Sequence, residues 1–523
     1  MINGVRSMPK CFRTKLIDLY AGEYAVVLNP ADATELGVRQ LDRVRVVTDH
    51  GAVTAIVETS QSIVKDDQIG ILTKMKIDLD LKEGDEVKVL PTEPPLSIEF
   101  IKKKMDGREL TTEEITAIIS DMAKYNLSDI EITAYVTAVY TKGLTMREMK
   151  DACLAMVKTG EVIEIDRKPI FDHHSIGGCP GNKVTLLVVP IAVAAGLTVP
   201  KTSSRAISSA CGTADIMEAI CPVTLSAQQI KSITEEIGGV IVWGGGLHLS
   251  PVDDMIIRIE YPLSIDPFSM VVASVMSKKK AVGAEYFVLD IPLGPETKVK
   301  TDDMALKYSR AFIDIGTELG IETACAISYG HQPIGRNIGP SLEAKEALEA
   351  LEGKPSSSSL IEKSLGLAGM LLEMGNVARP GEGIKEARKI LEDGRALAKF
   401  KQIVEAQGGK ANMKSTDITL GEFSKEILAK GHGYVSIIHN KMITKVVRTA
   451  GAPKDKGAGM VLFKKLGDRV EKGDPLFKIY ADHQGKLENA WKQAEALQPY
   501  ITKGMILDTI TDNTPRLDKV RRF

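Results

Sequence analysis

Aromatic residues are scarce in this chain of 523 residues, at 5% of the sequence with two tryptophans. Binding of single-stranded nucleic acid by base stacking needs aromatic platforms, so this scarcity weakens such an interpretation. An excess of one charge is also lacking, because 67 Lys and Arg stand against 69 Asp and Glu, for a formal net charge of −2. We therefore expect no nucleic-acid partner and a small molecule as the substrate.

Signals for secretion or membrane insertion are absent from the sequence. The six cysteines are scattered without a C-x-x-C pair, and no apolar segment follows the first twelve residues. The longest uncharged run, 184–200, is interrupted by Thr185, Pro190 and Gly196 and is shorter than the ~20 apolar residues of a membrane span. We expect a cytoplasmic protein that makes no membrane contact.

The length suggests three or four domains, and the first of them is β-rich. Pro91, Pro94 and Pro95 interrupt regular structure and mark a linker, so the N-terminal domain should cover 1–92. A small β-barrel is the natural closure of its short β-prone runs, which lie at 24–28, 43–48, 52–59, 69–72 and 86–90.

A helical subdomain should follow at 97–167. Its four helical patterns include three capping boxes, in which a hydroxyl and a Glu three residues later satisfy free N–H groups of the first turn. The three pairs are Thr111 with Glu114, Ser128 with Glu131, and Thr145 with Glu148.

From 168 to 422 the pattern becomes strand, Gly-rich loop and helix, repeated several times. This alternation predicts a central α/β domain with a largely parallel sheet. After 425, short β-prone runs and a helix at 487–497 predict a C-terminal α+β domain, in which 435–481 resembles the half-barrel of biotinyl or lipoyl carriers. The fold class is thus a multi-domain α/β protein. The strand candidates of the central domain are 169–171, 199–201, 240–242, 286–290 and 323–327.

The segment 172–178, Asp-His-His-Ser-Ile-Gly-Gly, is expected to be a loop between a strand ending at Phe171 and a helix beginning near Pro180. Two adjacent glycines let backbone N–H groups approach an anion, and a helix N-terminus adds a favourable dipole. An ordinary turn would explain the same pattern, with His173 and His174 exposed or satisfied in the core.

A second polar loop covers 203–213. Its four serines, Thr213 and Arg205 are all donors suited to phosphate oxygens. The alternative is a helix cap formed by Thr213 or Ser209 before a helix at 214–220, although a cap does not need Arg205. Because two such loops lie about thirty residues apart, as in successive βα units, the sequence favours a phosphate site.

A third group lies around an apolar helix. Ser274 and Lys278 are spaced i, i+4 and share one helix face, and Asp266 precedes them. On their own, the pair is compatible with a solvated face and Asp266 with a helix N-cap.

Four blocks resemble a known family. They are DHHSIGGCPGNKV (172–184), KTSSRAISSACGTADIME (201–218), VVASVMSKKKAVG (271–283) and GHQPIGRNIGPSLEAKEAL (330–348). The region 97–523 resembles the thymidine/pyrimidine-nucleoside phosphorylases, whose phosphate loop reads D-K-H-S-T-G-G. The N-terminal barrel and the Ser-Ser-Arg-Ala-Ile loop are similar to the archaeal branch that acts on nucleoside 5′-monophosphates.

This resemblance implies an activity and an architecture. The activity is phosphorolysis of AMP, and of CMP and UMP, to the free base and ribose 1,5-bisphosphate, which feeds a ribulose-bisphosphate route of nucleotide salvage. Phosphate is a co-substrate, and neither a metal nor another cofactor is expected. The helical subdomain would combine 97–167 with 252–283, the phosphate-binding domain 168–251 with 284–422, and the C-terminal domain would be 425–523. A homodimer or higher homo-oligomer is expected.

The resemblance also implies site residues. His174 would be the catalytic-loop histidine and Asp266 the proton donor, although either could protonate the leaving base. As an acid, Asp266 would need a partly apolar cleft. The implied contacts to phosphate, base or nucleotide are Ser175, Gly178, Thr185 (with Pro180 taken as an insertion), Ser203, Ser204, Arg205, Ala206, Ile207, Ser208, Ser209, Thr213, Arg258, Ser274, Lys278 and Lys298.

One position departs from the family pattern: His173 stands where the family has Lys. Replacing a fixed positive charge by an imidazole puts the phosphate affinity and its pH dependence in question. Three other functions remain as alternatives: a pyrimidine-nucleoside (thymidine/uridine) phosphorylase, a phosphoribosyltransferase, and a biotinyl or lipoyl carrier in which Lys441 would be the modified lysine.

Overall fold

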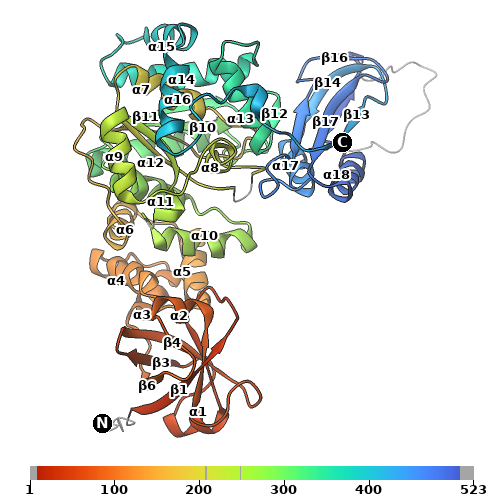
Figure 1. Cartoon of the computed structure of the whole chain (residues 1–523). Helices are drawn as coiled ribbons and strands as arrows, with labels where there is room; N and C mark the ends of the chain where they lie inside the picture. Colours follow the sequence, from red (N-terminus) through yellow and green to blue (C-terminus); the bar gives the residue numbers. More distant parts are fainter. Residues whose placement is uncertain (1–8, 207–208, 248, 507–523) are drawn as a thin grey trace, which may run out of the picture. The chain divides into compact units, whose positions relative to one another are not determined.

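The computed structural model describes residues 9–206, 209–247 and 249–506 (Figure 1). The chain forms two compact units. The first contains Met1–Val162, His248–Val282 and Asp314–Gly320, and the second contains Ile163–Leu247, Gly283–Ile313 and Ile321–Phe523. No helix in the described ranges is both long enough and apolar enough to cross a membrane.

The first unit begins with a closed six-stranded barrel, in the strand order β1-β5-β2-β4-β3-β6, which confirms the prediction. Apolar residues that alternate with polar ones fill its interior, as at Val44 and Val46 of one strand. The strand β1 was missed because only Phe12 and Thr14 of its eight residues are buried. The barrel elements are β1 (Lys10–Ile17), β2 (Ala25–Leu28), α1 (Pro30–Leu36), β3 (Arg43–Thr48), β4 (Gly51–Thr59), β5 (Gln68–Leu72), α2 (Thr73–Asp78) and β6 (Glu86–Thr92).

Helices make up the rest of the first unit. All three predicted capping boxes are confirmed, with the hydroxyl and the glutamate of each box bonded reciprocally. Helices α10 and α11 pack against this bundle. The helices are α3 (Ser97–Met105), α4 (Thr112–Ala123), α5 (Asp129–Lys142), α6 (Met146–Thr159), α10 (Pro251–Leu263) and α11 (Phe268–Ala281).

The barrel is joined to the helices by a nearly buried cation. The Arg43 side chain, 6% exposed, pairs with the Glu131 carboxylate, and Arg43 Nε donates to the Asn126 carbonyl at 3.2 Å. Beside it the rings of Tyr24 and Tyr125 lie 4.8 Å apart. Glu131 is also the acid of a capping box, so one carboxylate serves both the helix start and the barrel.

The second unit is built on parallel strands. The strands β11-β10-β7 pair in parallel, as do β8-β9, and the Phe171 N–H donates to the Thr198 carbonyl at 2.8 Å to join the two groups. The predicted largely parallel sheet is therefore confirmed. Its strands are β7 (Phe171–Ser175), β8 (Val199–Ser203), β9 (Gly239–Trp243), β10 (Tyr286–Leu293) and β11 (Glu322–Tyr329).

The first strand of this sheet was predicted at the wrong place. Instead of ending at Phe171, β7 begins there and includes His173 and His174, which were expected in a loop. The buried Asp172 carboxylate lies 3.4 Å from the Lys201 ammonium of the neighbouring strand. Because Lys201 of β8 neutralises Asp172, the polar strand β7 can be buried. A search of the sequence for apolar runs cannot detect a strand that is buried in this way.

Helices cover this sheet, and α7 packs against both α14 and α16 in the large apolar core (Figure 1). The first of them begins at Thr185 and not near Pro180, because the chain turns at Gly181, whose φ is +76°, and residues 182–183 are not helical. The helices are α7 (Thr185–Ala194), α8 (Thr213–Met217), α9 (Ala227–Ile237), α12 (Asp302–Leu319), α13 (Pro340–Leu351), α14 (Ser358–Met374), α15 (Gly383–Glu392) and α16 (Arg395–Ala406), with short 3-10 turns η1 (Gly244–Leu247) and η2 (Ser415–Asp417).

The C-terminal part confirms the α+β prediction. It contains a four-stranded sheet in the order β12-β15-β17-β13 and a three-stranded sheet in the order β16-β14-β18. Its elements are β12 (Asn337–Ile338), β13 (Phe423–Leu428), β14 (Gly433–Ile438), α17 (Asn440–Thr449), β15 (Gly459–Leu462), β16 (Arg469–Val470), β17 (Pro475–Ala481), α18 (Gln484–Leu497) and β18 (Tyr500–Lys503).

The Arg43 contact predicts a large effect of one substitution. Arg43→Ala should lower the free energy of opening of the barrel by about 3 kcal/mol or more, because it leaves a largely buried carboxylate without its cation. Hydrogen exchange of the β3 and β4 amides measures this energy. As a control, Lys102→Ala removes the exposed ion pair to Glu99 and should cost less than about 1 kcal/mol. Equal exchange rates in the two variants would contradict the expectation.

Candidate functional site

The first candidate loop follows β7, whose last two residues are His174 and Ser175. Both side chains are half-buried, and Ser175 lies opposite Asp290 of β10. Ser175 Oγ accepts hydrogen bonds from Asn182 Nδ2 at 2.9 Å and from the Gly177 N–H at 3.4 Å. The preceding His173 is 1% exposed, so the position that holds Lys in the family is enclosed here.

Gly178 brings two predicted contacts together. Its φ is +90°, and a Cβ atom there would lie 2.6 Å from the Lys298 backbone nitrogen and 2.9 Å from Thr297 Cα. Only a residue without a side chain allows this approach of two backbones. The structure thus places Gly178 beside Lys298, although 119 positions (298 minus 179) lie between them in the sequence.

The rest of this loop is bonded to the segment 331–339. The Ile334 N–H donates to the Pro180 carbonyl at 3.0 Å, and Cys179 Sγ donates to the Gln332 carbonyl at 3.2 Å. Burial raises the pKa of the Cys179 thiol to about 11, so this cysteine stays protonated and unreactive at neutral pH. Thr185, 5% exposed, is the first residue of α7, directly after the loop.

The second candidate loop joins β8 to α8 and is folded back on itself. Asp215 Oδ2 accepts hydrogen bonds from the N–H groups of Ala206 at 2.7 Å and Gly212 at 2.9 Å. The N-cap of α8 is Gly212, so neither Thr213 nor Ser209 caps this helix, and the Asp215 carboxylate holds the N-cap N–H instead. Ser209 Oγ donates to the Cys211 carbonyl at 3.0 Å.

Other polar residues of this loop have structural partners or lie outside the description. Ser203 Oγ donates to the Val242 carbonyl at 3.0 Å, which fixes the end of β8 against β9. The Ser204 carbonyl accepts from the Ala214 N–H at 3.3 Å. The predicted contacts Ile207 and Ser208 lie outside the described residues. The ligand contacts assigned to this loop from the sequence stay predictions.

Arg205 is held by acidic neighbours and an aromatic ring. Its guanidinium donates to Glu218 Oε2 at 2.7 Å and to Asp215 Oδ1 at 3.3 Å, and it lies 4.7 Å from the Trp243 ring centre. The hydrogen bond from Arg205, together with Lys456, lowers the pKa of Glu218 to about 2. Arg205 thus fastens the loop to α8.

In the first unit, α11 brings Ser274 and Lys278 together, and α10 contributes Asp253. Lys278 Nζ lies 3.4 Å from Ser274 Oγ and 2.6 Å from Asp253 Oδ2. Asp253 is 1% exposed, so its carboxylate is a buried anchor for the lysine. This geometry makes Ser274 and Lys278 one polar group on the face of α11.

Arg258 and Asp266 do not join that group. Arg258 Nη2 donates to Asp129 Oδ1 at 2.5 Å and passes so close to Gly22 that a Cβ there would overlap its guanidinium. Asp266 is exposed, in the connection between α10 and α11, and Pro267 occupies the N-cap of α11. The expectation of a partly apolar cleft around Asp266 is therefore wrong for this structure, and so is the N-cap alternative.

Sequence reasoning missed the polar residues that support the first loop. They are Asn182, Asp290, Ser328 and Lys363, which meet around Asp290 of β10, opposite the last residue of β7. Asn182 stood inside a recognised block and Asp290 at the end of a predicted strand, and both signals could have singled them out.

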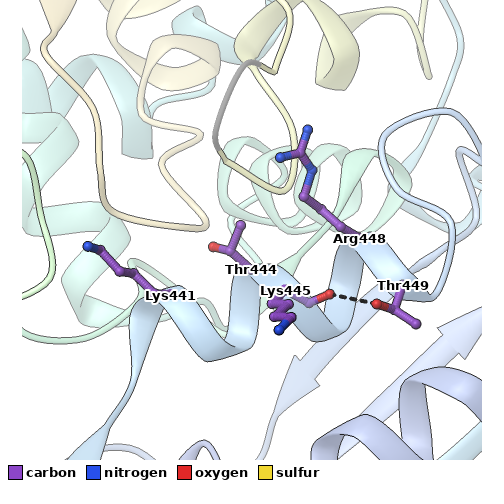
Figure 2. A pocket seen from close by; sticks show the side chains of 5 residues that line it. All are labelled: Lys441, Thr444, Lys445, Arg448 and Thr449. Carbon is purple, nitrogen blue, oxygen red and sulfur yellow. Dashed lines mark hydrogen bonds between the residues drawn. The ribbon is translucent and has the colours of Figure 1, made fainter. Parts of the chain in front are cut away.

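Lys441 does not occupy a turn between strands, as a modified carrier lysine would. Figure 2 shows it in α17, where it lines a pocket of about 380 Å³. The carrier alternative therefore finds no support in the geometry. The other residues that line the pocket come from the same helix: Thr444, Lys445, Arg448 and Thr449.

Models of known families match the chain segment by segment. The glycosyl transferase family matches twice, with its helical bundle domain over 98–160 and its a/b domain over 167–397. The pyrimidine nucleoside phosphorylase C-terminal domain matches 434–500, and the molydopterin dinucleotide binding domain matches 13–71.

Relatives are similar over almost the whole chain. The AMP phosphorylase of Methanococcoides burtonii is 48% identical over 94% of this chain and 97% of its own. AMP phosphorylase 1 of Archaeoglobus fulgidus is 46% identical over 95% and 98%. The AMP phosphorylase of Thermococcus kodakarensis is 47% identical over 95% and 99%.

The fold of a solved structure is also similar. Anthranilate phosphoribosyltransferase from Thermus thermophilus superposes with a TM-score of 0.51 at 19% identity, over 59% of this chain and 99% of its own. At this identity the likeness concerns the fold alone.

The close approach at Gly178 predicts a difference between two neighbouring substitutions. Gly177→Ala should lower the free energy of unfolding by about 1–2 kcal/mol, because alanine is strained at the φ of +87°. No steric cost is added, since nothing lies within 4 Å of the new Cβ. Gly178→Ala should cost about 1–3 kcal/mol more, because its Cβ collides with the backbone at 297–298. Urea titrations of both variants measure the difference, and equal values would show that the two backbones are not in contact.

Proposed function

Because the chain belongs to the family of these AMP phosphorylases, a branch of the thymidine/pyrimidine-nucleoside phosphorylases, we propose that it catalyses the phosphorolysis of AMP. Phosphate attacks C1′, the bond from C1′ to the base breaks, and adenine and ribose 1,5-bisphosphate are released. The observation that carries this activity is the pair of anion-suited loops at the carboxyl ends of the adjacent parallel strands β7 and β8.

Phosphate is assigned to these two loops. Backbone N–H groups of a glycine turn and nearby hydroxyls can hold an anion without a metal, and we assign this role to Ser175, Gly178, Ser203 and Thr213. Holding phosphate and ribose in fixed positions lowers the entropic part of the barrier. His174, the next-to-last residue of β7, lies beside Ser175 and is assigned to the same anion.

The departing base needs a proton or a hydrogen bond, because negative charge develops on it as the C–N bond breaks. We assign base contact to Ser274 and Lys278, which the Asp253 carboxylate holds in place. Asp266 is the proposed proton donor.

The substrate range, the use of the product, the cofactors, the location and the oligomeric state are part of the same proposal. CMP and UMP are further substrates, and the ribose 1,5-bisphosphate enters a ribulose-bisphosphate route of salvage. Phosphate is the co-substrate, and no metal or other cofactor takes part. The enzyme acts in the cytoplasm as a homodimer or higher homo-oligomer.

Product analysis tests the activity directly. Incubation of the purified enzyme with AMP and phosphate should give adenine and ribose 1,5-bisphosphate in equal amounts, with no turnover when phosphate is omitted. Adenosine, uridine and thymidine serve as controls and should react at least ~10²-fold more slowly, because a nucleotide site loses its charged contacts with them. Faster turnover of uridine or thymidine than of AMP would instead identify a pyrimidine-nucleoside phosphorylase.

The assignment of the acid predicts the behaviour of one variant. Asp266→Asn keeps the size of the side chain but cannot deliver a proton, so turnover of AMP should fall by about 10²–10⁴-fold while AMP binding is largely retained. Steady-state kinetics with AMP and with a nucleotide whose base leaves without protonation provide the test. The variant should recover most of its rate on the second substrate.

His174→Gln is the matched control for this prediction, because His174 is assigned to phosphate and should stay impaired on both substrates. If His174→Gln is rescued by the good leaving group and Asp266→Asn is not, then His174 is the acid and Asp266 orients the base.

A further inference from the structure

A buried polar cluster lies beneath the first loop, outside every assigned contact. Asp290, 0% exposed, is the centre of this cluster. Its Oδ2 lies 2.8 Å from Lys363 Nζ of α14 and 3.5 Å from Asn182 Nδ2, and its Oδ1 accepts a hydrogen bond from Ser328 Oγ at 2.5 Å. Three residues from three other segments thus meet at the Asp290 carboxylate.

The carboxylate determines which way the Asn182 amide faces. An ionised carboxylate accepts hydrogen bonds and donates none, so the amide group nearest to it must be the NH₂ and not the carbonyl oxygen. The same NH₂ group donates its other hydrogen to Ser175 Oγ at 2.9 Å. Asp290 therefore fixes Asn182 as a donor toward Ser175.

The hydroxyl of Ser175 is oriented in turn. A serine hydroxyl has two acceptor lone pairs and one hydrogen to donate. Asn182 Nδ2 and the Gly177 N–H both donate to Ser175 Oγ, so they occupy the lone pairs. The hydrogen of the hydroxyl must then point away from both, which leaves it to donate to another acceptor.

We propose that Asn182 is a positioning residue that keeps the Ser175 hydroxyl as a hydrogen-bond donor toward bound phosphate, with Asp290 and Lys363 holding Asn182 in place. This role rests on the proposed function, in which Ser175 contacts the phosphate co-substrate. Asn182 acts through Ser175 and does not need to touch the ligand.

The ion pair between Lys363 and Asp290 explains how a carboxylate can lie under an anion site. An unpaired carboxylate next to the loop would repel phosphate, and burying it alone would be costly. The Lys363 ammonium, 9% exposed, neutralises it at 2.8 Å. The pair orients Asn182 without adding net negative charge beneath the loop.

Binding of inorganic phosphate, measured by isothermal titration calorimetry on the full-length protein, tests the proposal as a double-mutant cycle. Asn182→Ala and Ser175→Ala should each weaken phosphate binding by about tenfold or more, the effect of losing one hydrogen bond to a charged group. The double variant should bind no more than about twofold more weakly than Ser175→Ala, because Asn182 acts through that hydroxyl. Additive losses, or an unchanged affinity in Asn182→Ala, would overturn the proposal.

Two further variants guard against a purely structural effect. Asn126→Ala removes another asparagine-to-aspartate hydrogen bond, from Asn126 Nδ2 to Asp121 Oδ1 at 3.0 Å, and should leave phosphate binding unchanged.

If Asn182→Ala does not fold, Asn182→Asp keeps the shape of the side chain and removes the hydrogen-bond donor. The introduced carboxylate should then take the Ser175 hydrogen, and phosphate binding should fall more than tenfold. Retention of wild-type phosphate affinity in Asn182→Asp would contradict the role.

The kinetics of AMP turnover separate this inference from the proposed function. In an active enzyme, Asn182→Ala should raise the KM for phosphate about tenfold and change the KM for AMP less than twofold. A wild type that binds phosphate but does not cleave AMP refutes the function, while the binding cycle still decides the role of Asn182. A wild type that cleaves AMP with an additive cycle refutes the role of Asn182 alone. Absence of phosphate binding by the wild type overturns both.

Discussion

The buried ammonium of Lys183 is the contact on which the first loop depends. Lys183 is 0% exposed, and its Nζ lies 2.6 Å from the Glu346 carboxylate, 2.9 Å from the Asn337 carbonyl and 3.2 Å from the Ile334 carbonyl. Lys183 lies at the end of the loop that follows Ser175. Its ammonium therefore ties this loop to the segment 331–339 and to Glu346 of α13. Loss of either charged partner would leave the other buried and uncompensated, at a cost of about 3–5 kcal/mol.

The C-terminal domain is tied to the same segment by a second lysine. Lys465 Nζ donates to the Gly335 carbonyl at 2.8 Å and also to that of Pro333, while burial and the nearby Lys183 lower the pKa of Lys465 to about 8. Gly335 has φ +68°, and a Cβ there would lie within 2.7 Å of both Lys183 Nζ and the Glu346 carboxylate. The segment 331–339 therefore joins the first loop to the C-terminal sheets.

Features that depend on local physics could be predicted from the sequence. The capping boxes and most strands were correct, because each depends on residues that are neighbours along the chain. The position of β7 was wrong because the burial of Asp172 depends on Lys201, which comes from another strand. Arg258 matched a base-contacting position, yet its guanidinium bonds to Asp129 and lies beside Gly22 of the barrel, which no spacing in the sequence could reveal.

The predicted ligand contacts could also be found from the sequence, whereas the charged residues that hold them in place could not. Residues that could touch a ligand gather in short loops, so a motif reveals them together, whereas the charges behind them come from distant elements. Ser175 depends on Asn182 and the Asp290–Lys363 pair, Ser274 on Lys278 and the buried Asp253, and the second loop on Asp215 with Arg205 and Glu218. In each case a carboxylate is paired with a cation, so the support of the predicted contact adds little net charge. Such paired charges hold a predicted contact in place without leaving an unpaired acid, which would repel an anion bound at the loops.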